Sequence, residues 1–189
     1  MKIAVYHELP KGGARGSVNE ISLNLKKRHT VDLYTLGIHR GEEKYYSHTY
    51  SYKFIEKKWK GKNWRVRIYK DTIELLKLYI LNKKIASTIR NRHYDIVFVH
   101  ASKYIEAPFL LRFENKNKVF YLHDPYYRYV YEKELRGIVR SGFSRNLYEK
   151  CMRVIKKNLD YQNIKKADTV IANSKFSKRL FERTYRKKA

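Results

Sequence analysis

Lys2-Ile-Ala-Val-Tyr-His-Glu-Leu-Pro-Lys-Gly-Gly-Ala-Arg-Gly-Ser17 is the stretch that decides the fold of this chain. It predicts a short apolar strand, a glycine-containing turn and the start of a helix, and Val31-Asp-Leu-Tyr-Thr-Leu36 predicts a second strand. In a parallel strand–helix–strand unit the helix N-terminus points unpaired N–H groups at the crevice above the sheet. Gly12, Gly13 and Gly16 would let the backbone approach a ligand closely, which makes the turn a candidate anion site. A tight turn that only connects the two elements remains the alternative.

Length and composition indicate one globular domain over residues 1–189, because 43% of the residues are hydrophobic. The 43 Lys and Arg residues against 18 Asp and Glu residues give a formal net charge of +25. This excess favours a polyanionic partner, which could be a phospholipid surface, a nucleic acid or a phosphorylated substrate. A compositional bias of the source genome is the alternative explanation for part of it.

Cys151 is the single cysteine, which excludes a disulfide within one chain and a cysteine-rich zinc site and suits a reducing cytosol. The apolar run before His7 is too short for a signal peptide, and no stretch approaches the ~20 apolar residues of a spanning helix. No tight Asp or His cluster has the spacing of metal ligands, so no metal is expected. We therefore expect a cytoplasmic protein whose membrane contact, if any, is peripheral.

Strands and helices alternate along the rest of the chain. Further strands are expected at 50–55, 94–99, 119–122 and 169–172, and helices at 16–28, 66–92, 104–113, 131–139, 145–166 and 175–187. Ser17 is expected to cap the first helix, and Tyr69, Ile73, Leu76 and Ile80 have the spacing of a buried stripe in the long one. The alternation predicts an α/β fold with a Rossmann-like, doubly wound, mostly parallel sheet.

Polar side chains follow four of the predicted strands, at the edge where such sheets bind ligands. They are His7 and Glu8, then His100, then His123 and Asp124, and finally Asn173 and Ser174. A lone strand-end histidine is usually a surface residue or a satisfied, half-buried one. Four polar strand ends on one edge favour a binding or catalytic site.

Three segments, in this order, carry a resemblance to a known family. They are Lys11-Gly-Gly-Ala-Arg15 with Glu20 in the helix after it, the strand that ends in His123-Asp124, and Ala167-Asp-Thr-Val-Ile-Ala-Asn-Ser-Lys-Phe-Ser177. Together they resemble the N-terminal half of a GT-B glycosyltransferase of family 4, also called glycosyl transferases group 1. In that family the last segment places a serine at the lip of the cleft and starts a helix.

The resemblance implies two Rossmann-like domains, of which this chain would be the acceptor-binding first one. A C-terminal donor-binding domain or subunit would hold a nucleotide-diphosphate sugar as donor substrate, with no other cofactor, in a retaining transfer of hexosyltransferase type. This chain alone would be inactive, and it would be an excised domain or a separately encoded subunit. Glu106 and Glu114 share the eight-residue spacing of the family's donor-site glutamates, but they precede the fifth strand, so we attribute the match to chance.

By the same resemblance, His123 faces the acceptor and the transferred sugar and is the catalytic candidate. The candidate acceptor- or phosphate-binding residues are Gly12, Gly13, Ala14, Arg15, His100, Asp124, Asn173 and Ser174. Helix N–H groups and a cleft imidazole could stabilise developing charge and orient the acceptor hydroxyl. Asp124 is the nearest carboxylate to a nucleophile, but it suits a cap of the following turn better.

Lys57-Lys-Trp-Lys-Gly-Lys-Asn-Trp-Arg-Val-Arg67 interleaves tryptophan with cations, a composition typical of segments at an anionic lipid interface. The expected membrane-contact residues are Lys57, Lys58, Trp59, Lys60, Lys62, Trp64, Arg65 and Arg67. Arg136, Arg140, Arg145, Lys150, Arg153, Lys156 and Lys157 could extend this footprint. We therefore expect a glycan or lipid-linked acceptor of cell-surface glycan biosynthesis, met at the inner face of the membrane.

Two other function classes remain open. One is a non-catalytic membrane-anchoring or partner subunit of a two-chain glycosyltransferase, which a reading frame that continues into a second α/β domain would argue against. The other is a basic nucleic-acid-binding protein. No recognised recognition motif is present and the basic residues are spread over every expected helix, so no specific nucleic acid is expected.

Overall fold

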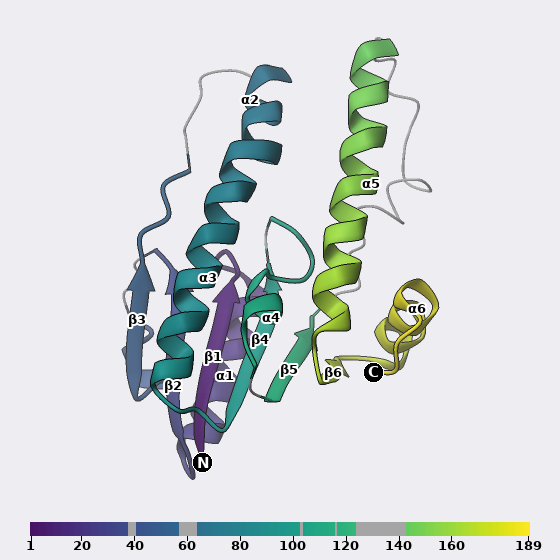
Figure 1. Cartoon of the computed structure of the whole chain (residues 1–189). Helices are drawn as coiled ribbons and strands as arrows, with labels where there is room; N and C mark the ends of the chain where they lie inside the picture. Colours follow the sequence, from purple (N-terminus) through teal and green to yellow (C-terminus); the bar gives the residue numbers. More distant parts are fainter. Residues whose placement is uncertain (38–40, 57–63, 103, 116, 124–142) are drawn as a thin grey trace.

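The computed structural model describes the chain except for residues 38–40, 57–63, 103, 116 and 124–142 (Figure 1). The described residues form one six-stranded sheet. Its strands are β1 (Lys2–Glu8), β2 (Thr30–Leu36), β3 (His48–Tyr52), β4 (Ile96–Ser102), β5 (Asn117–Leu122) and β6 (Thr169–Ala172). All neighbours pair in parallel, in the order β3-β2-β1-β4-β5-β6. The predicted α/β, Rossmann-like fold is therefore confirmed.

Helices connect the strands. They are α1 (Gly13–Lys26), α2 (Trp64–Tyr69), the π-helical turn η2 (Lys70–Glu74), α3 (Leu75–Asn91), α4 (Leu110–Phe113), α5 (Phe143–Lys165) and α6 (Lys175–Tyr185), with a 3₁₀ turn η1 (Glu43–Tyr45) before β3. The continuous helix α2–η2–α3 and helix α5 extend beyond the carboxyl ends of the strands (Figure 1). Within the described part of the chain, no helix is long and apolar enough to span a membrane.

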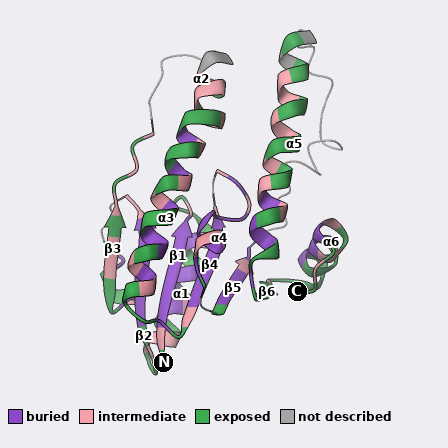
Figure 2. Ribbon diagram, in the orientation of Figure 1, coloured by how far each residue is buried: buried purple, intermediate pink, exposed green. Residues whose placement is uncertain are grey.

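The sheet carries an apolar layer on each face, because successive side chains of a strand point to opposite sides. Val5 of β1 packs in one cluster with Val18 of α1. Tyr6, the next residue, packs on the other face in a cluster with Ile85 of α3 and Phe181 of α6. The burial colouring in Figure 2 shows the central strands buried, with exposed residues on the outer sides of the helices. The sheet is thus wound on both faces, which leaves its carboxyl edge to carry ligands.

The predicted helix over 66–92 exists, but its predicted buried stripe is wrong. Ile73, Leu76 and Ile80 are 45%, 59% and 60% exposed. The buried face instead carries Glu74, Leu78, Asn82, Ile85, Ala86 and Ile89. The π turn η2 adds residues to one turn and so shifts the face that a regular 3.6-residue period would bury. The helix carries apolar residues on its exposed side as well as on its buried side. The spacing of apolar residues alone therefore did not identify the face that packs inward.

Several predicted boundaries also differ. The strand expected at 50–55 is His48–Tyr52, which pairs in register with β2. Ser17 is no cap, because α1 already begins at Gly13, and the Ser17 hydroxyl donates to the Gly13 carbonyl at 3.2 Å. The helix expected over 104–113 shortens to α4, since Pro108 disfavours a helical conformation at the residue before it. The helix expected at 131–139 lies outside the described residues.

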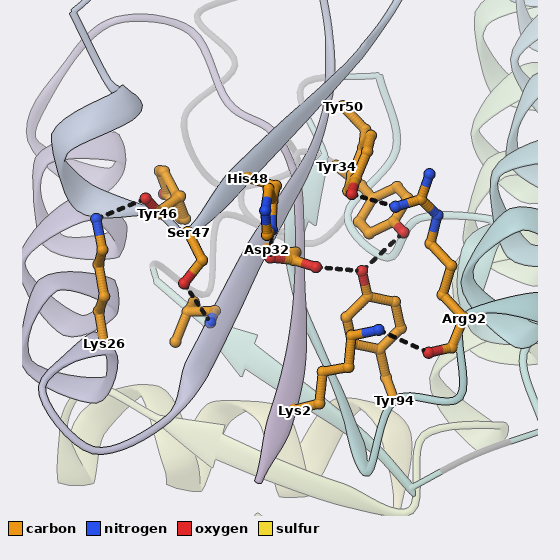
Figure 3. A network of polar contacts seen from close by, with 11 residues as sticks. Lys2, Lys26, Asp32, Tyr34, Tyr46, Ser47, His48, Tyr50, Arg92 and Tyr94 are labelled. Atoms are coloured by element: carbon orange, nitrogen blue, oxygen red, sulfur yellow. Dashed lines mark hydrogen bonds and ion pairs between the residues drawn. The ribbon is translucent and has the colours of Figure 1, made fainter.

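A polar network centred on Asp32 ties β2 and β3 to the chain just before β4 (Figure 3). The buried Asp32 carboxylate accepts the Tyr94 hydroxyl at 2.6 Å, and its other oxygen lies 2.9 Å from His48 Nδ1. Tyr34 and Tyr94 share a hydroxyl–hydroxyl bond of 2.9 Å, and burial raises the pKa of Tyr34 to about 12. Asp32 and Tyr94 stand near the amino ends of β2 and β4, so we assign the network to fold stability.

Candidate functional site

The strand order locates the expected ligand crevice. Successive strands run outward from β1 through β2 to β3 and, on the other side, from β4 through β5 to β6, so the order reverses between β1 and β4. In sheets of this kind, ligands bind at that switch point, beyond the carboxyl ends of the strands. Glu8 of β1 and Ser102 of β4 pair across it. The polar residues around these ends therefore form the candidate site.

Two of the predicted histidines contact each other at the ends of β4 and β5. His100 Nδ1 lies 2.9 Å from His123 Nε2, and the side chains are buried. Burial, followed by the nearby positive charge that His123 and His7 would carry, holds the pKa of His100 well below its usual range. Burial also lowers the pKa of His123 to about 4. Both imidazoles are therefore neutral at pH 7 and able to donate or accept hydrogen bonds.

The end of β6 joins this histidine pair. The Asn173 side-chain amide donates to the backbone carbonyl of His123, and its oxygen accepts the Ser177 hydroxyl at 2.8 Å. The Ser174 hydroxyl accepts the Ser177 backbone N–H at 3.0 Å and caps α6. The structure thus brings together His100, His123, Asn173 and Ser174, with Ser174 acting through the start of a helix.

The glycine turn lies at the end of β1. Gly12 is the N-cap of α1 with φ +158° and ψ −175°, whereas Gly13 is its first helical residue. Arg15 is buried and its Nε lies 2.5 Å from Glu42 Oε1, which also accepts the Asn19 amide at 3.2 Å. Burial alone would raise the pKa of Glu42, but the hydrogen bonds from Arg15 and Asn19 lower it. Arg15 is therefore held by an internal carboxylate, and Ala14 is half-buried beside it.

The sequence pointed to Glu8 as a polar strand end, but it did not reveal the buried polar cluster around this residue. The Glu8 carboxylate accepts hydrogen bonds from Tyr6, from Ser102 and, at 3.2 Å, from the Asn82 amide. Asn82 Oδ1 in turn accepts the Leu110 backbone N–H at 2.9 Å, which connects the cluster to α4. Burial, followed by the charge of Glu8, raises the pKa of Tyr6 well above its usual value. The one hint of this cluster in the sequence was Asn82, a polar residue in an otherwise apolar stretch of the helix.

A cavity of about 120 Å³ opens beside this cluster. Its lining residues come from the ends of β1 and β2, from α1 and from the segments after β3 and β4; they are Glu8, Leu9, Pro10, Arg15, Leu36, Phe54, Glu56 and Tyr104. The Tyr104 hydroxyl donates to Glu56 at 2.7 Å. Burial, followed by the hydrogen bond to Glu56, raises the pKa of Tyr104. The cavity has room for several water molecules or for part of a polyol.

Some predicted site residues lie outside the described residues. Asp124, Lys57, Lys58, Trp59, Lys60, Lys62, Arg136 and Arg140 belong to undescribed segments, and Trp64, Arg65 and Arg145 lie in helices without described side chains. Arg67 donates to Glu149 of α5 at 2.8 Å. Lys156 pairs with Asp71 and so faces α2–η2–α3, whereas Lys150 and Lys157 are exposed and Arg153 is partly buried.

No group of three His, Cys, Asp or Glu side chains is placed to hold a metal ion in the described part of the chain. Glu106 and Glu114 lie between β4 and β5. The chemistry that these residues support is hydrogen bonding to hydroxyls by neutral imidazoles, carboxylates and helix N–H groups.

Comparisons with known proteins give one similar solved structure and one matching family. A crystal structure of a UGT transferase from Siraitia grosvenorii in complex with UDP superposes with a TM-score of 0.46 at 8% sequence identity. The superposition covers 92% of this chain and 44% of that one, so this chain spans less than half of that protein's length. No curated protein matches the sequence. The profile of Glycosyltransferase Family 4 matches residues 11–189, nearly the whole chain, and the protein therefore belongs to that family.

Proposed function

We propose that this chain is the acceptor-binding, N-terminal domain of a retaining GT-B glycosyltransferase of hexosyltransferase type. It works with a C-terminal domain or subunit that binds a nucleotide-diphosphate sugar. The observation that carries this proposal is the neutral His100–His123 pair at the carboxyl edge of the sheet, in a chain of Glycosyltransferase Family 4. The cavity beside Glu8 lies at the same edge and supplies hydrogen-bond acceptors for hydroxyl groups.

In this proposal, His123 acts as a neutral imidazole that hydrogen-bonds the reacting acceptor hydroxyl or the transferred sugar. The ring of His123 is held by the hydrogen bond between its Nε2 and Nδ1 of His100. The backbone carbonyl of His123 is held by the side-chain amide of Asn173. The N–H groups at the start of α1, after Gly12, face developing negative charge. Most stabilisation of the diphosphate leaving group comes from the donor-binding part.

The test uses the chain joined to its donor-binding part and measures sugar transfer from a nucleotide-diphosphate sugar. His123→Asn is expected to lower kcat by about 100-fold, because the oriented hydrogen bond is lost. Ser87→Ala, on the exposed side of α3, is the control and should leave kcat unchanged. The product anomer should keep the configuration of the donor sugar. An unchanged kcat in His123→Asn, or an inverted anomer, would contradict the proposal.

We further propose that the acceptor is a glycan or lipid-linked glycan met at an anionic membrane surface. The outer side of α2–η2–α3 supports this part: Ile73, Leu76 and Ile80 are exposed, and Lys77 and Lys84 flank them. The acidic groups of the same stretch face inward, since Asp71 pairs with Lys156 and Glu74 is buried. An apolar row beside lysines matches a lipid interface, where each Lys contributes roughly 1 kcal/mol.

Cosedimentation with phosphatidylglycerol-containing vesicles tests the membrane part. The doubly substituted Leu76→Asp/Ile80→Asp chain should remain in the supernatant, whereas Phe176→Asp, an equally exposed site on α6, should sediment like the unsubstituted chain. Equal sedimentation of both variants would contradict this interface. Binding to random-sequence duplex DNA that survives physiological salt would favour the nucleic-acid alternative instead. An anchoring subunit would sediment but leave transfer unaffected by His123→Asn.

A further inference from the structure

Four aromatic side chains meet where β4 and β5 end, on the face of the sheet that carries α1. They are Phe98 and His100 of β4, Tyr121 of β5 and His123 directly after β5, and we call them the ring cluster. Side chains two residues apart along a strand point to the same face. Phe98 and Tyr121 pack in the apolar cluster that includes Val18 of α1, which identifies this face. The imidazole pair of the candidate site is therefore part of an aromatic surface.

Tyr121 contacts the other three rings of the cluster. It pairs with His100 across the two parallel strands, and their ring centroids lie 5.5 Å apart. The centroid of Tyr121 lies 4.8 Å from that of His123, with the ring planes inclined at 59°. It lies 5.9 Å from that of Phe98, in an edge-on arrangement. Aromatic rings at these separations and inclinations attract each other, so Tyr121 restricts the orientation of both imidazoles.

The hydrogen bond inside the cluster uses one nitrogen of His123 and leaves the other. Nε2 of His123 lies 2.9 Å from Nδ1 of His100. A neutral imidazole has one N–H and one lone pair, on different nitrogens, so this bond engages Nε2 in either tautomer. His100 is 0% exposed, so a ligand meets His123 rather than His100. Nδ1 is therefore the nitrogen of His123 that remains to meet a hydroxyl group.

The ring cluster also accounts for the neutral state of the pair. Burial lowers the pKa of His123 to about 4. Burial is also the first cause of the low pKa of His100, followed by the charges that His123 and His7 would carry. The rings of Phe98 and Tyr121 occupy space beside the imidazoles that water would otherwise fill, and water stabilises the charged form. Loss of the Tyr121 ring should therefore make His123 easier to protonate.

We propose that Tyr121 is a positioning residue of the transfer: its ring holds Nε2 of His123 on His100, so that Nδ1 contacts the acceptor hydroxyl or the transferred sugar. The inference rests on the proposed function, in which His123 contacts these groups. Tyr121 acts through His123 and requires no contact with substrate. The ring of Tyr121 makes the contacts with the imidazoles, so phenylalanine should be able to replace it.

Imidazole ¹⁵N NMR of the chain at pH 7.5 and pH 5.5 tests this proposal. Tyr121→Leu and Tyr121→Met remove the ring, whereas Tyr121→Phe keeps it. In the unsubstituted chain and in Tyr121→Phe, a scalar coupling across the hydrogen bond should connect Nε2 of His123 to Nδ1 of His100. Without the ring this coupling should disappear, and the proton affinity of His123 should rise about 10-fold. About one quarter of His123 would then be protonated at pH 5.5, against about 3% in the unsubstituted chain.

Tyr161→Leu is the matched control, because Tyr161 is a partly buried tyrosine of α5 that stacks on Tyr185. It should keep the coupling and the protonation state of His123. In the joined two-part enzyme, Tyr121→Leu should lower kcat about 10-fold and change KM less than about 2-fold, since the acceptor binds but meets a misoriented imidazole. Tyr121→Phe should keep kcat within about 2-fold of the unsubstituted enzyme.

Three outcomes would overturn the inference. They are a coupling that runs through Nδ1 of His123, no coupling in the unsubstituted chain, and ring-free variants that keep both the coupling and kcat. The NMR readout is separate from the proposed function, because it requires no donor and no transfer. If the coupling depends on Tyr121 while His123→Asn leaves transfer unchanged, only the catalytic assignment fails. If transfer depends on His123 but the coupling and kcat survive in Tyr121→Leu, only the inference about Tyr121 fails.

Discussion

His123 shares a hydrogen bond of 2.9 Å with His100, so one of the two facing nitrogens carries a proton and the other accepts it. A second proton on the pair would place a positive charge in a buried site beside His7, which is why the pKa of His100 is held so low. At the residue scale the site is therefore built for neutral hydrogen bonding.

The depressed pKa values predict a loss of stability in acid. With a pKa of about 4 folded and about 6.5 unfolded, His123 is neutral in both states above pH 7. As the pH falls below 6.5, the unfolded state takes up the proton first, so the free energy of unfolding decreases. For His123 the loss at pH 5 is about 2 kcal/mol. Urea unfolding at pH 7.5 and pH 5 measures it.

The His123→Asn variant is the control, because its free energy of unfolding should change less between these two pH values.

The carboxyl of Asp160 has the opposite effect on the pH dependence of stability. Burial raises the pKa of its carboxyl to about 7, so its contribution to stability grows as the pH falls from 7 towards 4. Asp160 is present in the unsubstituted chain and in His123→Asn, so its contribution cancels when the pH dependence of one chain is subtracted from that of the other. Identical pH dependence in the two chains would contradict the assignment to His123.

Gly12 and Gly13 offer a matched pair of substitutions in the glycine turn. Gly12 takes φ +158° and ψ −175°, a conformation that is essentially restricted to glycine, whereas Gly13 is helical. Gly12→Ala should lower the free energy of unfolding by about 1–3 kcal/mol. Gly13→Ala should leave it unchanged or raise it by up to about 1 kcal/mol, since a Cβ there meets open space. Thermal or urea unfolding of both variants measures the two changes. Equal changes in the free energy of unfolding would contradict the assignment of a glycine-restricted conformation to Gly12 alone.

At the scale of elements, α6 and β6 are positioned by two short polar residues. Asn173 fastens the end of β6 to the carbonyl of His123, and Ser174 starts α6 one residue later. A single turn thus links the start of a helix to the backbone of the catalytic candidate. The serine expected at the lip of the site contributes through this link, as the N-cap of α6.

Ser174→Ala is expected to lower the free energy of unfolding by about 1 kcal/mol, because the N–H of Ser177 loses its side-chain acceptor. Ser87→Ala, an exposed substitution inside α3, should be neutral or slightly stabilising, since alanine is the better helix former. Urea denaturation of the two variants measures the difference. A Ser174→Ala chain as stable as Ser87→Ala would show that the cap contributes nothing.

The helix α2–η2–α3 shows which element-level features escape the sequence. Its existence follows from its apolar content, but its inner face does not. A regular helix through Tyr69, Ile73, Leu76 and Ile80 is equally periodic. Only tertiary contacts select the buried face, on which Ile85 packs in the cluster of the sheet and Leu78 packs with Ile105 and Phe109. Asn82 is buried on that face because it binds both Glu8 and the start of α4. Glu8 and Leu110 lie far from Asn82 along the chain, so these contacts leave no periodic pattern in the sequence.

At the scale of the whole molecule, the described residues form one half of a two-part reaction chamber in our proposal. We predict that this chain alone binds nucleotide-diphosphate sugars with a Kd above ~100 µM, because the groups that hold the diphosphate belong to the donor-binding part. Isothermal titration calorimetry with a set of nucleotide sugars, with the joined two-part enzyme as positive control, measures it. Submicromolar binding by this chain would contradict the assignment of donor and acceptor sides.

The sequence by itself determined the strand–helix alternation, and with it the parallel sheet and the edge that carries polar residues. These follow from short-range patterns: buried runs of β-branched residues, glycine turns and helical spacing. Tertiary structure alone decided the pairing of His100 with His123, the buried polar cluster around Glu8 and the internal partner of Arg15. Each of these depends on which strands become neighbours, a long-range choice made by burial of both sheet faces, and no local pattern encodes the distance between such side chains.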